Sequence, residues 1–359
     1  MIRYGEGIRA TMSVIQRTEN LARPRRVTLS DVAAHAGVSA VTASRALRHP
    51  QMVSPDLRAR VERAVDALGY IPNQLASALA SARTGTIGVL IQSLTNGVFA
   101  DYLKALHDAF LPAGFQVLVL NSRYIAAEEE RAVATLLGQH PEAMILAGVD
   151  QSDHARRMLE QSGVPVVQTM ELTEDPIDIN IGFSQFGAGY AATAHLLELG
   201  RRRIGHVSAR LDPRTRRRMD GYRAAMRDAG LEDHVASSPQ PSSVALGAQF
   251  FGELIERNPS LEAVFSCNDD LALGVLFECQ RRGIRVPEDM AIIGFNDLEV
   301  CASAFPSISS VSTPRYTMGE RSAEIVGRII RGDGVRPEPR IIDLGFEVKK
   351  RASTGGRAS

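Results

Sequence analysis

Two hydrophobic patterns alternate through most of the chain, from about residue 85 to residue 350. Short apolar runs, typical of strands buried on both faces, are separated by stretches with the 3.6-residue periodicity of amphipathic helices. The strand patterns form two successive sets: 86–94, 115–122, 143–150 and 165–171, then 179–183, 203–210, 263–269 and 290–297. Helix patterns near 99–112, 126–138 and 153–162 separate the first four strands. This alternation predicts parallel sheets with right-handed crossovers, so the two sets predict two similar, Rossmann-like α/β lobes.

The first part of the chain has a different pattern, which predicts three short helices. In "VTLSDVAAHAGVSAVTASRAL" (27–47), Thr28 can cap a helix that Gly37 ends, and Ser39 can cap a second short helix. A third helix is predicted over residues 55–68, with a proline at its first position. Two short helices joined by a glycine-containing turn and completed by a third are typical of a helix-turn-helix DNA-binding domain.

The distribution of charge supports DNA binding by this head. Residues 1–83 contain 12 arginines, no lysine and 6 acidic residues, whereas the rest of the chain carries 29 basic and 35 acidic residues. A basic head on an acidic body is typical of a nucleic-acid-binding module joined to another domain. In the second helix, Arg45 can donate to guanine, and Thr42 and Ser44 can bond phosphates or base edges. The alternative is a generic three-helix bundle with solvated hydroxyl groups.

The composition limits the classes of protein to which the chain can belong. With 359 residues, 44% hydrophobic and 23% charged, the chain is typical of a globular protein of two or three domains. No apolar run reaches the length of a membrane span, and the arginine-containing N-terminus lacks a signal-peptide core. The three cysteines have no metal-ligand spacing and suit a reducing compartment. We therefore expect a cytoplasmic protein with no membrane partner, no metal and no cofactor.

An Ala- and Leu-rich segment, "NQLASALASARTG" (73–85), follows the head. Asn73 can cap it, but a helix of this length is marginal alone in water, so we expect it to fold only with a partner. This spacing of head, hinge and body, with the phrases "TLSDVAAHAGVSAVTASRAL" and "VSPDLRARVERAVDALGYIPN", resembles the lactose-repressor family of bacterial transcription regulators. The similarity extends over nearly the whole chain from Val27 onward.

The resemblance implies a domain order and a set of partners. It implies a small all-α head and hinge helix joined to a two-lobed, periplasmic-binding-protein-like body, acting as a homodimer on a near-palindromic operator in double-stranded DNA. The expected segments are a disordered tail 1–26, the helix-turn-helix domain 27–72, the hinge helix 73–84, the effector-binding and dimerisation domain 85–350 and a tail 351–359. Within the body we expect lobe one over 85–171 and 314–332, and lobe two over 172–313 and 333–350.

The same resemblance implies individual DNA contacts. Ala40 and Val41 occupy the two positions that most often select base sequence, and Arg45 is a further base or phosphate contact. Leu79 is the hinge leucine that wedges into the minor groove at the operator centre, where it bends the duplex. The predicted DNA-binding residues are Thr28, Ser39, Ala40, Val41, Thr42, Ser44, Arg45, Asn73 and Leu79.

Polar residues follow the predicted strands of the body. Ligands of open α/β sheets bind beyond the carboxyl ends of the strands, and converging amides, carboxylates and guanidinium groups suit a polyhydroxylated ligand. Phe99 can cover the apolar face of a sugar. The resemblance implies that Arg218 clamps the effector and that Asn268 and Asn296 bond sugar hydroxyls. The predicted effector-binding residues are Asn96, Phe99, Arg123, Glu171, Arg214, Arg218, Asn268 and Asn296. The neighbouring Asp269 and Asp270 are equally consistent with helix capping.

Two observations favour a sugar acid as the effector. Many family members have Asp where this chain has Asn296, and losing that carboxylate while keeping several arginines favours an anion, because arginine binds carboxylates bidentately. The phrases "QSLTNGVFADYL", "ARLDPRT", "CNDDLALGVLFECQRRG" and "IIDLGF" are similar to the gluconate-operon repressor branch of the family. The hypothesis is a repressor of sugar or sugar-acid catabolism genes, controlled allosterically by gluconate or a related aldonate bound between two lobes.

Two other classes compete with this hypothesis. A sugar-binding protein of a transport or sensing system can share the body, but it would need an export signal and no DNA-binding head. An enzyme would need a nucleophile–base pair, a metal cluster or a glycine-rich phosphate loop, and the sequence contains none of these patterns. The carboxylates and histidine of "GVDQSDH" are explained by loop polarity. We therefore expect a regulator without enzymatic activity.

Overall fold

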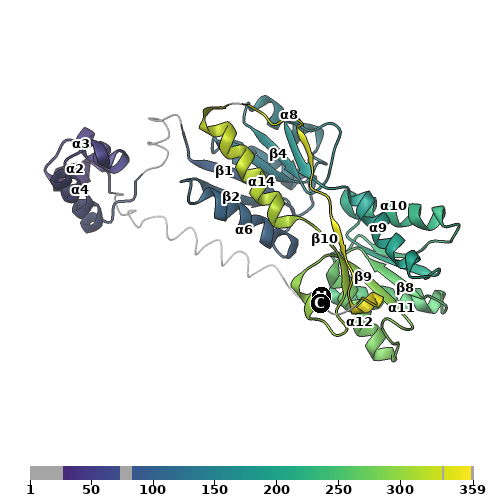
Figure 1. Ribbon diagram of the computed structural model, residues 1–359. Helices are drawn as coiled ribbons and strands as arrows, with labels where there is room; N and C mark the ends of the chain where they lie inside the picture. The colour runs from purple at the N-terminus through teal and green to yellow at the C-terminus, as the bar shows by residue number, and fades with distance from the viewer. Residues whose placement is uncertain (1–26, 73–82, 334, 357–359) are drawn as a thin grey trace, which may run out of the picture. The chain divides into compact units, whose positions relative to one another are not determined.

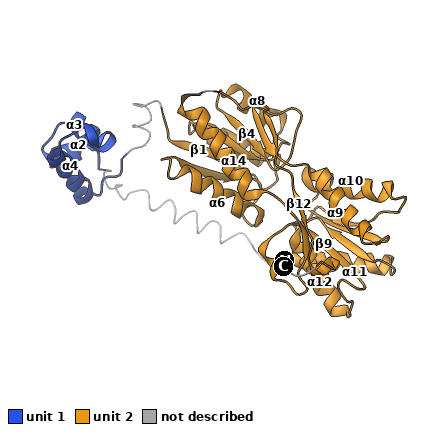
Figure 2. Cartoon of the chain, in the orientation of Figure 1, with its two compact units in different colours: residues 1–82 blue, residues 83–359 orange. Residues whose placement is uncertain are grey.

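The computed structural model describes residues 27–72, 83–333 and 335–356. The chain divides into two compact units, Met1–Ala82 and Arg83–Ser359 (Figure 2). The predicted tail 1–26 and most of the predicted hinge helix, including Asn73 and Leu79, lie outside the described residues. Within the described ranges, no helix has the length and apolar character needed to cross a membrane.

The first unit contains the three predicted helices. They are α2 (Leu29–Ala36), α3 (Ala40–Arg48) and α4 (Pro55–Leu68), with a 3-10 turn η1 (Pro50–Met52) between the last two (Figure 1). Thr28 caps α2, as predicted, and its backbone N–H donates to the Asp31 carboxylate at 2.8 Å. Gly37, with φ 64°, ends α2 in the left-handed conformation. Arg60 of α4 donates to the Ala36 carbonyl at 2.7 Å, which fixes the turn against the third helix.

The first lobe of the second unit is a six-stranded parallel sheet in the order β11-β5-β4-β3-β1-β2. Its strands are β1 (Thr86–Ile91), β2 (Gln116–Asn121), β3 (Ala143–Ala147), β4 (Val166–Thr169), β5 (Ile179–Gly182) and β11 (Ile341–Asp343). One face is covered by α6 (Val98–Phe110) and α14 (Arg315–Arg328), which continues into η2 (Ile329–Asp333); the other face is covered by α7 (Ala126–Leu137) and α8 (Asp153–Gln161) (Figure 1).

The second lobe repeats this plan in the order β12-β10-β9-β8-β6-β7. Its strands are β6 (Ile204–Ala209), β7 (His234–Ser238), β8 (Ala263–Ser266), β9 (Ala291–Asn296), β10 (Ser309–Ser312) and β12 (Glu347–Lys349), of which only β12 is antiparallel to its neighbour. Helices α9 (Gln185–Glu198) and α10 (Pro213–Asp228) cover one face, and α11 (Val244–Arg257) and α12 (Asp269–Arg282) cover the other. The short helix α13 (Glu299–Ser303) follows β9. The prediction of two similar parallel-sheet lobes is confirmed.

Two predicted lobe boundaries are wrong. The strand β5, assigned to lobe two, pairs with β4 in the first sheet. The reason is that the connection between these strands contains no helix: the Asn180 amide donates to the carbonyls of Gln168 at 3.1 Å and Glu171 at 2.8 Å and so closes a helix-free loop. The strand β11 also joins the first sheet, so the chain returns to lobe two after residue 343 rather than after residue 332.

The predicted C-terminal tail 351–359 is wrong as far as residue 356. Residues Ala352–Thr354 form the 3-10 turn η3, and the side chains of Ser353 and Thr354 are buried. The Ser353 hydroxyl donates to the Ile292 carbonyl at 2.6 Å, and the Thr354 hydroxyl bonds His195 at 3.0 Å. The end of the described chain is therefore part of the second lobe, held by residues distant in sequence.

The chain passes between the lobes three times: after β5, after β10 and after β11. Aromatic side chains pack at these crossings, with the Phe183 ring centroid 6.4 Å from those of both Phe295 and Phe346. One hydrophobic cluster runs from the α6 and α14 face of the first sheet to the α9 and α10 face of the second. The lobes therefore share part of one core as well as three covalent links.

Helices α9 and α10 pack backbone against backbone at two glycines. A Cβ atom at Gly221 would overlap the carbonyl oxygen of Phe186 and lie 2.7 Å from the Tyr190 nitrogen. A Cβ atom at Gly189 would lie 2.8 Å from the Cα atom of Arg218. The glycines allow the close approach that places the first turns of α10 beside the crossing between the lobes.

Candidate functional site

The exposed face of α3 carries residue types that contact DNA. Ala40, Val41 and Arg45 are exposed, and Val41 keeps 67% of its surface accessible. Ala43 and Ala46, on the opposite face, are buried in the core of the first unit. Small residues beside an exposed arginine allow the helix to approach the floor of the major groove closely. This face matches the predicted reading helix.

The hydroxyl groups of α3 are held by local bonds. Ser39 accepts a hydrogen bond from the Thr42 backbone N–H at 3.1 Å, and the two hydroxyls are 2.9 Å apart. The Ser44 hydroxyl accepts a hydrogen bond from Arg48. Arg45, by contrast, makes no side-chain hydrogen bond or ion pair within the ranges the structure covers. Its guanidinium is therefore the side chain of α3 best placed to donate to a base edge or phosphate.

We expect Arg45→Ala to weaken binding to a duplex selected by the parent protein from a randomised library by about tenfold to a hundredfold. Loss of one good arginine–base contact costs about 1 to 3 kcal/mol. Fluorescence anisotropy with the selected duplex measures this change. The matched control is Arg58→Ala, because Arg58 lies on α4 and pairs with Glu62 at 2.6 Å. Equal losses for both variants would contradict the assignment of α3 as the reading helix.

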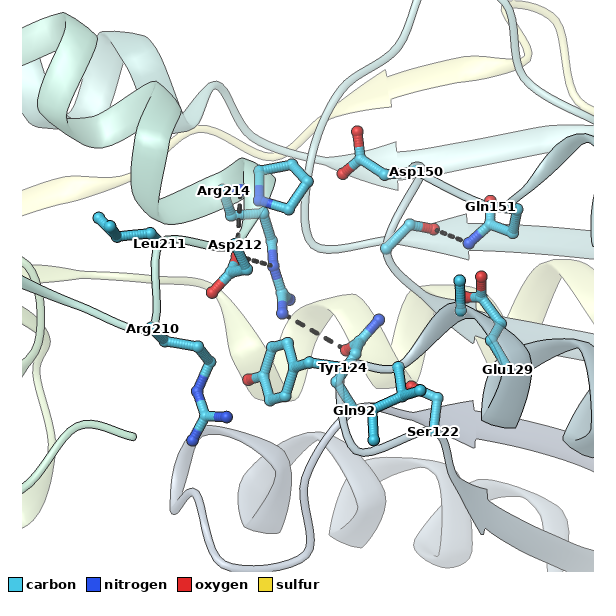
Figure 3. A pocket seen from close by; sticks show the side chains of 14 residues that line it. Gln92, Ser122, Tyr124, Glu129, Asp150, Gln151, Arg210, Leu211, Asp212 and Arg214 are labelled. Atoms are coloured by element: carbon cyan, nitrogen blue, oxygen red, sulfur yellow. Dashed lines mark hydrogen bonds and ion pairs between the residues drawn. The ribbon is translucent and has the colours of Figure 1, made fainter. Parts of the chain in front are cut away.

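A polar cavity of about 300 Å³ lies between the lobes of the body (Figure 3). The first lobe contributes Gln92 after β1, Tyr124 after β2 and Asp150 after β3. The second lobe contributes Arg210 after β6 and Arg214 at the start of α10. Each of these residues lies beyond the carboxyl end of a parallel strand, where ligands of open α/β sheets bind.

Two contacts between the lobes cross this cavity. The Arg210 guanidinium carbon lies 4.2 Å from the centroid of the Tyr124 ring, within the range of a cation–π contact. Arg214 Nη2 donates to Gln92 Oε1 at 3.4 Å (Figure 3). In both contacts the second lobe supplies the cation and the first lobe supplies the acceptor. A ligand in the cavity can therefore contact both lobes at once.

Arg214 is only 9% exposed, and its contacts are long. Its Nε is 3.6 Å from Asp212 Oδ1, and its contact with Gln92 is 3.4 Å long. Asp212 caps α10 and accepts from the Thr215 hydroxyl at 2.8 Å. Burial opposes ionisation of Asp212, but the charges of Arg214 and Arg218 and the bonds from Thr215 leave its pKa below the ordinary value. A guanidinium has five N–H donors, so Arg214 retains capacity for an anion.

One turn further along α10, Arg218 is buried and contacts residues of the second lobe. It donates to Gln185 Oε1 at 2.6 Å, to the Cys267 carbonyl at 2.7 Å and to Asn268 Oδ1 at 3.1 Å. Its guanidinium carbon is 3.9 Å from the centroid of the Phe295 ring. The structure therefore brings together the two predicted residues Arg218 and Asn268.

Glu171 extends this network toward the first lobe. Its Oε1 accepts from the backbone N–H groups of Leu172 at 3.0 Å and Gln185 at 3.3 Å. Its buried Oε2 accepts no hydrogen bond from the described residues, and Arg217 Nη1 lies 3.8 Å away. Burial raises the pKa of Glu171, and the opposing effects of its hydrogen bonds and of Arg217 do not cancel the rise. Arg217 also pairs with Asp150 at 2.9 Å and so links the lobes.

Seven of the eight predicted effector residues do not line the cavity, and four of these also lie outside the adjoining network. Asn96 accepts from the Val98 N–H at 3.1 Å at the start of α6, and Phe99 is buried in the core with 2% of its surface exposed. Arg123 is exposed, with φ 55°. Asn296 ends β9 and is buried, and its carbonyl accepts a hydrogen bond from Arg315. Of the eight predicted residues, Arg214 lines the cavity, and Arg218, Asn268 and Glu171 form the adjoining network.

The two neighbouring aspartates of α12 have different partners. Asp269 is fully buried and accepts from the Leu298 N–H at 2.8 Å and the Ser310 hydroxyl at 2.7 Å. Burial raises the pKa of Asp269 to about 6. Asp270 accepts from the Ser242 hydroxyl at 2.6 Å. Both side chains therefore connect α12 to neighbouring segments of the second lobe.

Several residues that line the cavity were not predicted as effector-binding, notably Gln92, Tyr124, Glu129, Asp150 and Arg210. The predicted strand 86–94 contains Gln92 in its interior, and the predicted strand 143–150 ends at Asp150. The strands end at Ile91 and Ala147, so the first polar residue beyond each apolar run was the available signal. Glu129 lies in the first turn of α7, where sequence alone gives no sign of a ligand.

A helix-turn-helix unit with an exposed reading helix, followed by a two-lobed body with a polar cavity, defines a DNA-binding regulator that responds to a small ligand. Within the part of the chain that the structure describes, no group of three or more His, Cys, Asp or Glu side chains is arranged to hold a metal ion. Comparisons with known proteins assign this regulator to a family.

Two family models match the chain. Residues 28–73 match the bacterial regulatory proteins of the lacI family, and residues 193–354 match a periplasmic binding protein-like domain. The chain is 43% identical over 345 residues to the transcriptional regulator GntR of Pseudomonas aeruginosa, covering 96% of this chain and 100% of that protein. The chain belongs to the lacI family of bacterial transcriptional regulators, which confirms the resemblance and the expectation of a regulator rather than an enzyme.

Solved structures agree with this assignment. A LacI-family regulator from Silicibacter pomeroyi matches with a TM-score of 0.86 and 32% identity, over 91% of this chain and 99% of that one. The lac repressor dimer bound to operator and an anti-inducer matches with a TM-score of 0.78 and 26% identity, over 92% of this chain and 99% of that one. The order of head and two-lobed body is therefore that of known family structures.

Proposed function

We propose that the protein is a homodimeric repressor of sugar or sugar-acid catabolism genes whose effector is gluconate or a related aldonate. The observation that supports a sugar acid most directly is Arg214, a buried guanidinium at the cavity with only long polar contacts. A ligand carboxylate can accept two short hydrogen bonds from such a group. The amides and hydroxyls of Gln92, Ser122 and Tyr124 suit the hydroxyl groups of the same ligand.

The relatives support the same class of ligand. The similar protein of Pseudomonas aeruginosa carries the name GntR, as does a 38% identical regulator of Escherichia coli. The phrases of this sequence that resemble the gluconate-operon branch include "ARLDPRT" (209–215), which contains cavity residues Arg210, Asp212 and Arg214. The proposal therefore places the effector beside a phrase of the second lobe that resembles the gluconate-operon branch.

In the proposed mechanism, the effector contacts cavity residues of both lobes and changes the angle between them. In a dimer, such a change moves the points from which the two predicted hinge helices leave the bodies. If these helices no longer pack side by side, they lose stability and the affinity for the operator falls. The two-fold symmetry of a dimer requires two inverted half-sites in the operator.

We expect gluconate, at about one hundred times its Kd, to stabilise the full-length protein by about 2.7 kcal/mol and to raise its melting temperature. Glucose, which lacks the carboxylate, and glucitol, which has an alcohol in its place, should have little effect at the same concentration. Differential scanning fluorimetry measures the three shifts. A shift with glucose and none with gluconate would overturn the proposed ligand class.

A further inference from the structure

The cavity has two chemically different ends. Arg210 and Arg214 lie at the end formed by the second lobe, whereas Glu129 and Gln151 lie at the end formed by the first lobe (Figure 3). Gln92 lies between them, beside Arg214 (Figure 3). An elongated ligand that places one end against the arginines therefore directs its other end toward Glu129.

Glu129 differs from the other two carboxylates that line the cavity. Asp150 pairs with Arg217 at 2.9 Å, and Asp212 lies 3.6 Å from Arg214. Glu129 takes part in none of the ion pairs found among the described residues. Its partners are neutral: the Ser152 backbone N–H and the Gln151 amide both stabilise its ionised form. The end of the cavity that faces away from the arginines therefore carries a negative charge without a matching cation.

Glu129 is also partly buried. It lies in the first turn of α7, and burial raises its pKa, with smaller contributions of the same sign from Asp150 and Glu130. A second anion brought near this group would be repelled by its carboxylate, and the repulsion is weakly screened because the site is partly buried. A neutral hydroxyl in the same place would instead donate a hydrogen bond to it.

We propose that Glu129 is a specificity-determining residue that limits the cavity to ligands with one anionic end. This inference rests on the proposed function and refines it: aldonates, with a carboxylate at one end and a primary alcohol at the other, are accepted. Aldarates, with a carboxylate at both ends, are rejected. Arg214 binds the single carboxylate, and Glu129 receives the hydroxyl at the far end.

Gluconate and glucarate test this proposal directly, because they share six carbons and differ only at the terminal carbon. We expect isothermal titration calorimetry of the full-length protein to show glucarate binding about a hundredfold more weakly than gluconate, the effect of one close pair of like charges. Glu129→Gln keeps the length and an accepting oxygen but removes the charge. This variant should reduce the difference between the two acids to about tenfold or less.

The matched control is Glu128→Gln. Glu128 is the preceding residue of α7, does not line the cavity and pairs with Arg131 at 2.7 Å. The Glu128→Gln variant should bind gluconate and glucarate with the affinities of the parent protein. Circular dichroism melts of both variants check that the fold is retained.

The outcomes separate the two proposals. Equal affinity of the parent protein for gluconate and glucarate, or an unchanged ratio in Glu129→Gln, would overturn the role of Glu129 while leaving an aldonate effector in place. No binding of either acid by the parent protein would instead overturn the proposed function. A ratio that falls equally in Glu128→Gln would show a general effect of charge on α7 and would also overturn the assignment.

Discussion

Gly221→Ala is expected to destabilise the body by about 3 kcal/mol or more, although it adds a single methyl group. The new Cβ atom would overlap the Phe186 carbonyl and lie 2.7 Å from the Tyr190 nitrogen. Both atoms belong to the backbone of α9, so a side-chain rotation cannot relieve the clash. Overpacking of this kind typically costs 1 to 3 kcal/mol, and more where backbone must move. Because α9 and α10 cover one face of the second sheet, the whole lobe should be affected.

Thermal unfolding of the full-length protein measures this effect. For a domain of this size, about 3 kcal/mol corresponds to a fall in melting temperature of roughly 6 to 12 °C. The control is Gly97→Ala, at the start of α6, where a Cβ atom would have no neighbour closer than Leu298 at 3.7 Å and φ is −56°. Similar melting temperatures for the two variants would show that α9 can shift to accept the methyl group.

Arg218→Met is expected to weaken gluconate binding by about tenfold to a hundredfold and to lower stability as well. Methionine fills much of the same volume but leaves Gln185 Oε1 and the Cys267 carbonyl without their donor. Each buried acceptor left unpaired costs about 1 to 3 kcal/mol. A hydrogen bond to a charged group contributes about 1.5 to 3 kcal/mol, which sets the expected loss of affinity if Arg218 or its network contacts the ligand.

The two effects are measured separately, by calorimetric titration with gluconate and by thermal unfolding without it. Arg227→Met is the matched control, because Arg227 lies in the last turn of the same helix and is exposed. It should change neither quantity. If Arg218→Met loses stability but keeps the affinity of the parent protein, Arg218 is a structural residue and does not contribute to binding of the effector.

The helices of the head could be predicted from sequence because their signals are local. Thr28, Gly37, Ser39 and the proline that begins α4 act within one helical turn, and each lies at the helix boundary it predicts. The alternation of strands and helices in the body could also be predicted from the sequence. Such short-range signals do not depend on the rest of the fold.

The errors arose where distant contacts decide the structure. The strand β5 joins the first sheet through a loop closed by the Asn180 side chain, so the expected helix between parallel strands is absent. The turn η3 is buried only because Ser353 and Thr354 reach partners such as Ile292 and His195, more than sixty positions earlier in the sequence. No local pattern contains that information.

The candidate site was predictable in its location but only partly in its residues. The rule that ligands bind beyond the carboxyl ends of strands led to Arg214 and to the neighbouring network. It missed Tyr124, whose contact with Arg210 at 4.2 Å exists only once the two lobes are packed together. It also missed Glu129, because a carboxylate in the first turn of a helix is common for reasons unrelated to ligands.

The three passages of the chain between the lobes limit how the body can move. Two lobes joined by a single crossing could twist and slide freely. Three crossings, with Phe183, Phe295 and Phe346 packed beside them, restrict the lobes to bending about one axis. A small molecule that draws the lobes together then produces one reproducible displacement of the surfaces furthest from the crossings. A single bending motion suits a regulator in which occupancy of one cavity must select between two states.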